Sequence, residues 1–166
     1  FGVGSANNGG GTDGQEFTFP ADAASAGTFI YVASEEDQFT AFFGFAPTYN
    51  AGSVMSINGD DAIELFENGS VSDTFGDINT DGSGEAWDYL DGWAYRNDDT
   101  GPEGATFTST NWTYSGANAL DGESDNASAT TPFPIGTFNQ QTASTSNNTI
   151  NGFNVYPNPV KGNSLT

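Results

Sequence analysis

Short apolar stretches alternate with polar, glycine-rich connections along the chain, and long amphipathic runs are few. This spacing predicts short strands joined by many turns. Residues 1–16 are rich in Gly and Asn, which favours a loop. We expect strands over residues 17–20, 28–33, 53–57, 62–66, 70–75, the end of 86–96, 111–115 and 131–138.

One short helix is expected over residues 35–44. Ser34 stands at the N-cap position, and the acidic first turn suits the positive end of the helix dipole. Gly44 would end the helix, because glycine readily adopts the left-handed conformation at a C-terminus. The side chains that would face the core are Phe39, Phe42 and Phe43.

The strongest hairpin pattern joins residues 62–66 to residues 70–75 through Asn68-Gly69, a pair typical of a type I′ turn. A two-residue loop would pair Glu67 with Ser70, Phe66 with Val71 and Glu64 with Asp73. Two carboxylates directly opposite each other are unfavourable. Either the register differs, or a positive group lies nearby; Arg96, one of two basic residues, is expected to pair with a carboxylate there.

The composition of the chain excludes several classes of function. The 166 residues suit one domain, and 14 Phe favour a folded chain. With 22 acidic and two basic residues the formal charge is −20, so we expect no nucleic-acid partner. The chain has neither His nor Cys, which excludes Ser-His-Asp and Cys-His catalysis and disulfides. No apolar stretch reaches the roughly 18 residues of a membrane span.

The segment "DINTDGSGEAWD" (77–88) matches the spacing of a calcium loop. Gly82 would give the tight turn, and Ser83 would offer its backbone carbonyl. The candidate side-chain ligands are Asp77, Asn79, Asp81, Glu85 and Asp88. A Gly- and Asp-rich connecting loop in an acidic chain is the other interpretation, and both stay open.

Aromatic residues at alternate positions suggest a second candidate site. Trp87 with Tyr89, and Trp93 with Tyr95, would share strand faces, where they could form a sugar-stacking platform. Packing in the core is the competing interpretation, because most aromatic side chains in a small domain are used that way.

Asp60 and Asp61 lie in "NGDDAIELF" (58–66), directly before an apolar strand. Asp side chains in turns accept hydrogen bonds from backbone N–H groups. We therefore expect these two residues to have a structural role and no catalytic one.

The C-terminal stretch "FNVYPNPVKGNSLT" (153–166) resembles the opening of a type A C-terminal sorting domain of the bacterial type IX secretion system. The matching core is Tyr156, Pro157, Asn158 and Pro159, preceded by a polar linker over residues 139–149. The resemblance implies a protein secreted by, or displayed on, a Gram-negative bacterium, with the type IX machinery as partner. The sorting segment, residues 150–166, would be truncated.

The stretch from Ile57 to Tyr89 is similar to bacterial lamin-tail domains, with an Asn-Gly-Asp-Asp turn, a hairpin, and Asp73 followed by Gly76. The resemblance implies that residues 1–138 form an all-β, immunoglobulin-like β-sandwich with one short helix. Its first strand would lie before Phe1, in a longer protein.

Such domains accompany secreted hydrolases as non-catalytic modules. We therefore expect a non-catalytic accessory or binding module, although an enzyme domain could precede residue 1. The alternative is a carbohydrate-binding module, attached to a nuclease or glycosidase, that contacts extracellular polysaccharide through Trp87, Trp93 and Tyr95.

Overall fold

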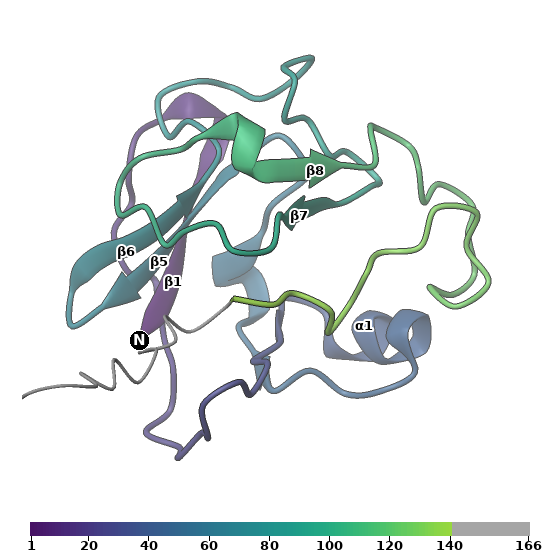
Figure 1. Cartoon of the computed structure of the whole chain (residues 1–166), viewed down its shortest axis with the longest axis horizontal. Helices are drawn as coiled ribbons and strands as arrows, with labels where there is room; N and C mark the ends of the chain where they lie inside the picture. Colours follow the sequence, from purple (N-terminus) through teal and green to yellow (C-terminus); the bar gives the residue numbers. More distant parts are fainter. Residues whose placement is uncertain (141–166) are drawn as a thin grey trace, which may run out of the picture.

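The structure, a computed structural model, describes residues 1–140, which form a small β-rich domain with one α-helix, α1 (Glu36–Phe43). The largest sheet has the order β2–β1–β5–β6, and each neighbouring pair is antiparallel. Figure 1 shows this sheet on one side of the molecule and α1 on the other. The strands are β1 (Gly2–Ala6), β2 (Phe17–Thr18), β5 (Ala62–Glu67) and β6 (Ser70–Phe75). The predicted class, β-rich with one short helix, is confirmed.

Two smaller sheets accompany the four-stranded one. The strands β3 (Val32–Ala33) and β4 (Tyr49–Asn50) pair in parallel, whereas β7 (Ala94–Arg96) and β8 (Trp112–Tyr114) are antiparallel. Short 3₁₀ helices lie between the strands: η1 (Asn7–Gly9), η2 (Gly52–Met55) and η3 (Ser109–Asn111).

The expected N-terminal loop is the main error of the sequence interpretation. Gly2–Ala6 forms β1, an inner strand with partners on both sides. Its glycines are required by the chain that returns over it. A Cβ on Gly2 would lie 2.4 Å from the carbonyl oxygen of Phe17, and one on Gly4 would lie 2.0 Å from that of Gly14. Residues 1–16 thus contain an inner strand of the main sheet, where the sequence predicted a loop.

Several predicted strands are shorter or absent. Residues 53–57 were expected to be extended, but η2 occupies most of them. Of residues 28–33 only Val32 and Ala33 pair, and residues 131–138 contain no strand. Prolines in that last segment remove two backbone donors, so the segment has less to offer a partner strand.

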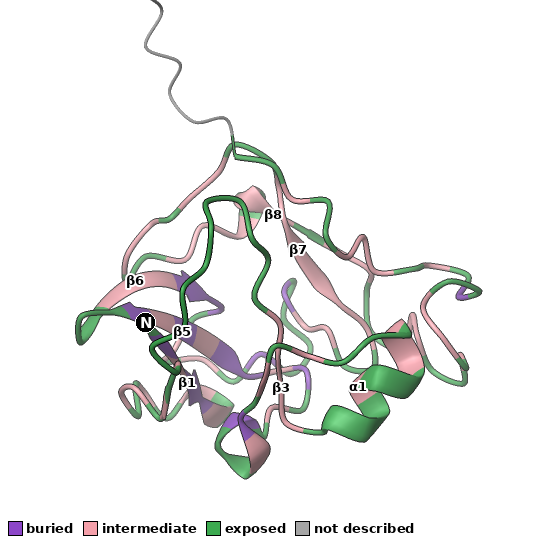
Figure 2. Cartoon of the chain, turned by 90° about the horizontal axis from the view of Figure 1, so that it is seen from below, coloured by how far each residue is buried: buried purple, intermediate pink, exposed green. Residues whose placement is uncertain are grey.

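Helix α1 begins differently from the prediction and ends as predicted. The N-cap residue is Glu35 in place of Ser34, and its side chain makes no capping bond. Gly44 is left-handed at φ 78°, and its N–H donates to the carbonyl of Thr40 at 2.9 Å. No residue of α1 is fully buried, so the helix lies at the periphery, as Figure 2 shows.

The β5–β6 hairpin resolves the predicted clash of carboxylates. Glu67 pairs with Ser70 and Phe66 with Val71, as predicted, but a bulge then shifts the register. Glu64 consequently faces Thr74. Asp73 forms an ion pair with Arg96, with 2.5 Å between the Arg96 Nη2 and Asp73 Oδ1 atoms. A register change and a positive partner are therefore both present.

An aromatic cluster joins the four-stranded sheet to β7 and β8. Phe75, at the end of β6, is 7% exposed and contacts four rings, those of Trp87, Tyr89, Phe107 and Trp112. The Arg96 guanidinium lies 4.4 Å from the ring centroid of Trp112, a cation–π geometry. This cluster is one part of the core; buried apolar side chains also come from β1, η2 and β5, namely Ala6, Met55, Ala62 and Phe66.

Candidate functional site

Asp61 fixes the turn ahead of β5. Its side chain, in a residue only 1% exposed, accepts hydrogen bonds from the N–H groups of Asn8 (2.9 Å) and Asn58 (3.1 Å). The side-chain amide of Asn7 donates a third bond at 3.1 Å. The structural role expected of Asp61 is confirmed, and its partners come largely from the segment after β1.

The hydrogen-bonding role expected of the Asp60 side chain is not found in the described part of the chain. Its Oδ1 atom is buried and has no hydrogen-bond partner within residues 1–140, while its carbonyl accepts from Gly82 N–H at 3.0 Å. Burial raises the pKa of Asp60, and the carboxylates of Asp61, Asp81 and Asp88 raise it further. Asp60 thus carries an electrostatic cost in its charged form.

The 77–88 loop uses its carboxylates to brace its own backbone. Asp77 accepts from Asn79 N–H and Thr80 Oγ1, both at 2.9 Å, and Asp81 accepts from Ser83 N–H at 3.0 Å. Asp88 accepts from the N–H groups of Gly84 and Leu90 at 2.9 and 3.0 Å. The side chain of Glu85 makes no such bond within the described chain, where no group of three or more carboxylates forms a metal-binding cluster. Calcium binding stays a prediction.

The predicted aromatic platform is divided between two environments. Trp87 is 5% exposed and packs in the core against Phe75 and Phe107. Trp93 and Tyr95 are half-buried against Phe133, and the Trp93 Nε1–H donates to Thr131 O at 2.9 Å. Trp87 therefore cannot stack on a ligand, and the three residues do not form one exposed face.

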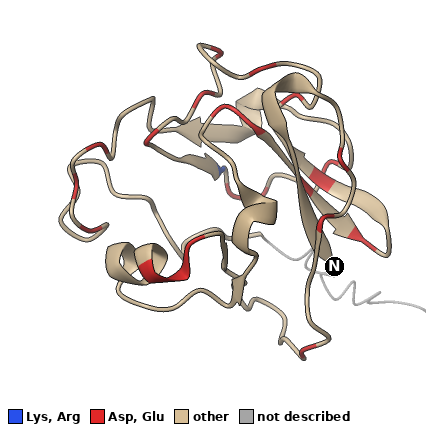
Figure 3. Cartoon of the chain, turned by 180° about the vertical axis from the view of Figure 1, so that it is seen from behind, with Lys and Arg blue, Asp and Glu red and all other residues tan. Residues whose placement is uncertain are grey.

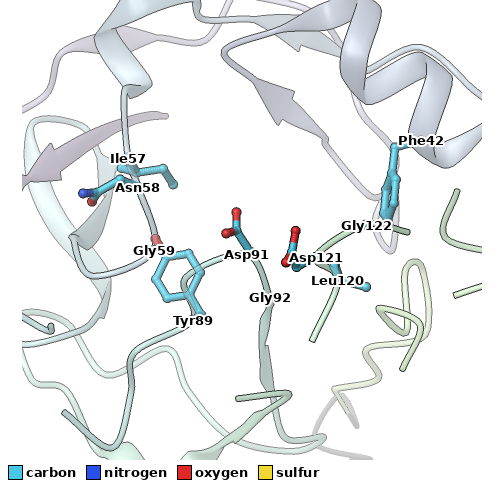
Figure 4. Close-up of a pocket in the computed structure, with 10 residues that line it drawn as sticks. All are labelled: Phe42, Ile57, Asn58, Gly59, Tyr89, Asp91, Gly92, Leu120, Asp121 and Gly122. Carbon is cyan, nitrogen blue, oxygen red and sulfur yellow. The ribbon is translucent and has the colours of Figure 1, made fainter. Parts of the chain in front are cut away.

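A cleft of about 470 Å³ lies where four separate segments meet, a size suited to a small ligand. Figure 4 shows Asp91 and Asp121 beside each other, with Tyr89 on one side and Phe42 on the other. Phe42 comes from α1, and Tyr89 comes from the loop before β7. The other lining residues are Ile57, Asn58, Gly59, Gly92, Leu120 and Gly122.

Tyr89 presents its ring to this cleft while its hydroxyl is engaged elsewhere. The hydroxyl donates to the carbonyl of Asp61 at 3.4 Å. Burial raises the pKa of Tyr89, and the charges of Asp61 and Asp60 add to the effect. The phenol therefore stays neutral, and Tyr89 contributes an aromatic surface.

The two cleft carboxylates both belong to Leu-Asp-Gly tripeptides, residues 90–92 and 120–122. These segments are held together by backbone bonds from Asn118 N–H to Leu90 O (2.6 Å) and from Leu120 N–H to Asp91 O (2.8 Å). Asp91 has a positive φ of 45°, an uncommon conformation for a non-glycine residue. A Cβ on Gly92 would lie 2.5 Å from Gly116 O, so glycine is required there.

The carboxylates of Asp91 and Asp121 accept no hydrogen bond and enter no ion pair within residues 1–140. The one Lys or Arg of residues 1–140, Arg96, does not line the cleft. Its side chain is 10% exposed and is bound to Asp73 and Glu103. Figure 3 shows how acidic positions are spread over the domain, against very little Lys or Arg. The cleft therefore carries uncompensated negative charge.

Sequence reasoning missed this cleft. Its residues are spread from position 42 to position 122, and no local spacing connects them. The repeated Leu-Asp-Gly tripeptide was the available signal, although Asp-Gly alone is typical of an ordinary turn.

Comparisons with protein-family models, with curated proteins and with solved structures find no match. Across the described residues, no helix has the length and apolar character needed to cross a membrane.

Proposed function

We propose that residues 1–138 form a non-catalytic binding module of a protein that is secreted by, or displayed on, a Gram-negative bacterium. The observation that carries the proposal is the cleft, in which two unpaired carboxylates and two aromatic rings from distant segments face one opening. Sites of this kind, concave with a few convergent polar groups, are where small ligands bind.

We propose export by the type IX secretion machinery, directed by the segment that starts at residue 150. The support is the resemblance of Tyr156, Pro157, Asn158 and Pro159 to a sorting signal. These residues, like most of the proposed linker, lie outside the described part of the chain.

For the fold we propose an immunoglobulin-like sandwich related to lamin-tail domains. Support comes from side-chain contacts between β6 and the β7–β8 pair. Arg96 of β7 reaches Asp73 of β6, and Trp112 of β8 contacts Phe75 at 4.8 Å between ring centroids. In this proposal β7 and β8 are the second layer, with three residues in each strand.

The charge of the surface restricts the ligand. Arg96 is neutralised internally, so the surface of residues 1–140 offers no Lys or Arg side chain for a phosphate or another anion. A ligand of the cleft is therefore neutral or cationic, and nucleic acid is disfavoured.

A carbohydrate-binding module is the second candidate, and the lining of the cleft favours it. Aromatic rings such as Tyr89 and Phe42 can pack on the apolar face of a sugar, while carboxylates accept hydrogen bonds from its hydroxyls. The cleft replaces the predicted Trp87, Trp93 and Tyr95 platform as the place of contact.

Native gel electrophoresis in gels loaded with different polysaccharides tests the binding function. We expect at least one polysaccharide to retard the parent chain. The same polysaccharide should no longer retard Asp91→Asn, whereas Trp93→Ala should be retarded like the parent. No retardation by any polysaccharide would remove the carbohydrate candidate. Release of reducing sugar by the purified chain would contradict the non-catalytic assignment.

Deletion of residue 151 onward, with whatever follows in the natural protein, tests export. We expect the deleted protein to stay in the periplasm of the producing cell. Normal secretion of the deletion would refute the sorting role.

A further inference from the structure

We propose that the cleft recognises an amine-bearing sugar, with the ammonium group of a hexosamine unit held between Asp91 and Asp121. The inference rests on the proposed binding function and adds the chemical class of the ligand. Both residues line the cleft and stand next to each other in it (Figure 4).

Charge selects an amine over an uncharged ring. A neutral ligand that covers two unpaired carboxylates removes water from them and returns only hydroxyl donors, which leaves part of the desolvation cost uncompensated. An ammonium group brings a positive charge and three donors, and hydrogen bonds between ionised partners are the stronger kind. Since no Lys or Arg of residues 1–140 lines the cleft, the ligand itself must supply this charge.

The apolar walls of the cleft favour a ligand with a sugar ring over a ligand with a single flexible chain. Tyr89 and Phe42 bound an opening to which four segments contribute, and Ile57 and Leu120 add apolar surface. A sugar ring offers C–H faces to such walls, and an ammonium close to an aromatic face gains a cation–π contribution. A lysine side chain has the same ammonium without the ring, so it serves as the discriminating ligand.

The backbone segments that carry Asp91 and Asp121 are joined to each other before a ligand arrives. The hydrogen bonds between the Leu-Asp-Gly segments join the loop before β7 to the loop after β8. The N–H of Asn126 also donates to Phe42 O at 2.9 Å, which ties the end of α1 to the same region. Such bracing lowers the ordering cost of binding.

Isothermal titration calorimetry of the 166-residue chain with a glucosamine disaccharide tests the inference, and the N,N′-diacetylated disaccharide is the matched ligand without the charge. We expect Asp91→Asn and Asp121→Asn each to weaken binding of the amine form about tenfold, as for one lost hydrogen bond to a charged group. Asn suits the positive φ of position 91, so the backbone is preserved. Glu67→Gln removes an equal charge from the exposed hairpin, outside the cleft, and should bind normally.

A thermal melt of each variant and the amide NMR shifts of Gly59, Gly92 and Gly122 separate local binding from misfolding. Equal binding of both disaccharides, lost in Asp91→Asn, would overturn the amine assignment and leave a sugar-binding module. If Glu67→Gln and Asp91→Asn lost equal affinity for the amine disaccharide, the effect would come from net charge alone. That result would also overturn the amine assignment. Tighter binding of Nα-acetyl-lysine amide would point to a protein partner. No binding of either disaccharide would refute the inference, while the gel assays judge the wider function independently.

Discussion

Glu64 is 2% exposed, and it is one of the two largest fully buried side chains of residues 1–140, the other being Asp61. The Thr12 hydroxyl donates a hydrogen bond to Glu64 Oε2, from the segment that returns after β1. Asp61 is bound by Asn7 and Asn8 of the same segment. Buried carboxylates thus attach residues 7–12 to the sheet, because a buried charge needs donors.

Replacing Thr12 by Val tests this attachment at the level of one hydroxyl. The change keeps the shape of the side chain and removes a donor from a buried carboxylate. We expect the free energy of unfolding to fall by about 1–3 kcal/mol in urea titrations. Thr12→Ser keeps the hydroxyl and should lose much less. Identical stability of Thr12→Val and the parent would show that Glu64 does not depend on this bond.

Replacing Asp60 should stabilise the protein, whereas replacing Thr12 should destabilise it, and the effect of Asp60 should depend on pH. The pKa of Asp60 is raised in the folded protein, so the native state favours the protonated form, and its contribution to stability falls as the pH rises through that pKa. At neutral pH, Asp60→Asn should therefore stabilise the protein, by about 1 kcal/mol or less for a partly exposed charge.

The gain from Asp60→Asn should fade in melts at progressively lower pH, as the parent residue becomes protonated. Asp13→Asn, a substitution of an exposed acid outside the Asp60–Asp88 region, provides the control. A gain that is equal at acidic and neutral pH would contradict the electrostatic explanation.

At the scale of elements, the sequence predicted those features that depend on the conformation of a few neighbouring residues. The Asn68-Gly69 turn and the Gly44 helix end were foreseen, since each depends on one or two backbone conformations. Strand β1 was not, because Gly2–Ala6 has no strong strand former except Val3, and its extended form depends on β2 and β5. The bulge lies next to Asp73, whose contacts with Arg96 and with the N–H of Glu103 are equally non-local.

The candidate site was unpredictable for a related reason. Trp87 fits a platform pattern in sequence, yet it is buried against Gly82, where a Cβ would lie 2.4 Å from the indole ring. Asp91 and Asp121 belong to loops that meet only through tertiary hydrogen bonds. The pattern of residue types is available from sequence, whereas the surface they share is not.

The 77–88 loop provides the test of the calcium prediction. Calcium that binds only the native state raises the midpoint of thermal unfolding by mass action. We expect a shift for the parent and for Asp60→Asn, and none for the double variant Asp77→Ala and Asp81→Ala. A shift lost only in Asp60→Asn would move the ion to the 58–61 turn. No shift in any protein would leave the loop as a self-braced connection.

At the scale of the whole molecule, the N-terminal segment completes the domain. Strand β1 pairs with β5 over five residues, and the segment behind it supplies donors to Asp61 and Glu64. Without residues 1–16, β5 becomes a sheet edge with two buried carboxylates that lose donors. Removing one partner of a buried charge typically costs about 3–5 kcal/mol, a large part of the stability of a domain.

The central claim is that residues 1–140 form one independent module, to which residues 1–16 are essential and residues 141–166 are not. Thermal unfolding followed by circular dichroism for residues 1–166, 1–140 and 17–140 tests it most directly. The account predicts cooperative transitions with the same midpoint for the first two chains and no cooperative transition for the third. A cooperative transition of residues 17–140 near the parent midpoint, or a lower midpoint for residues 1–140, would contradict it.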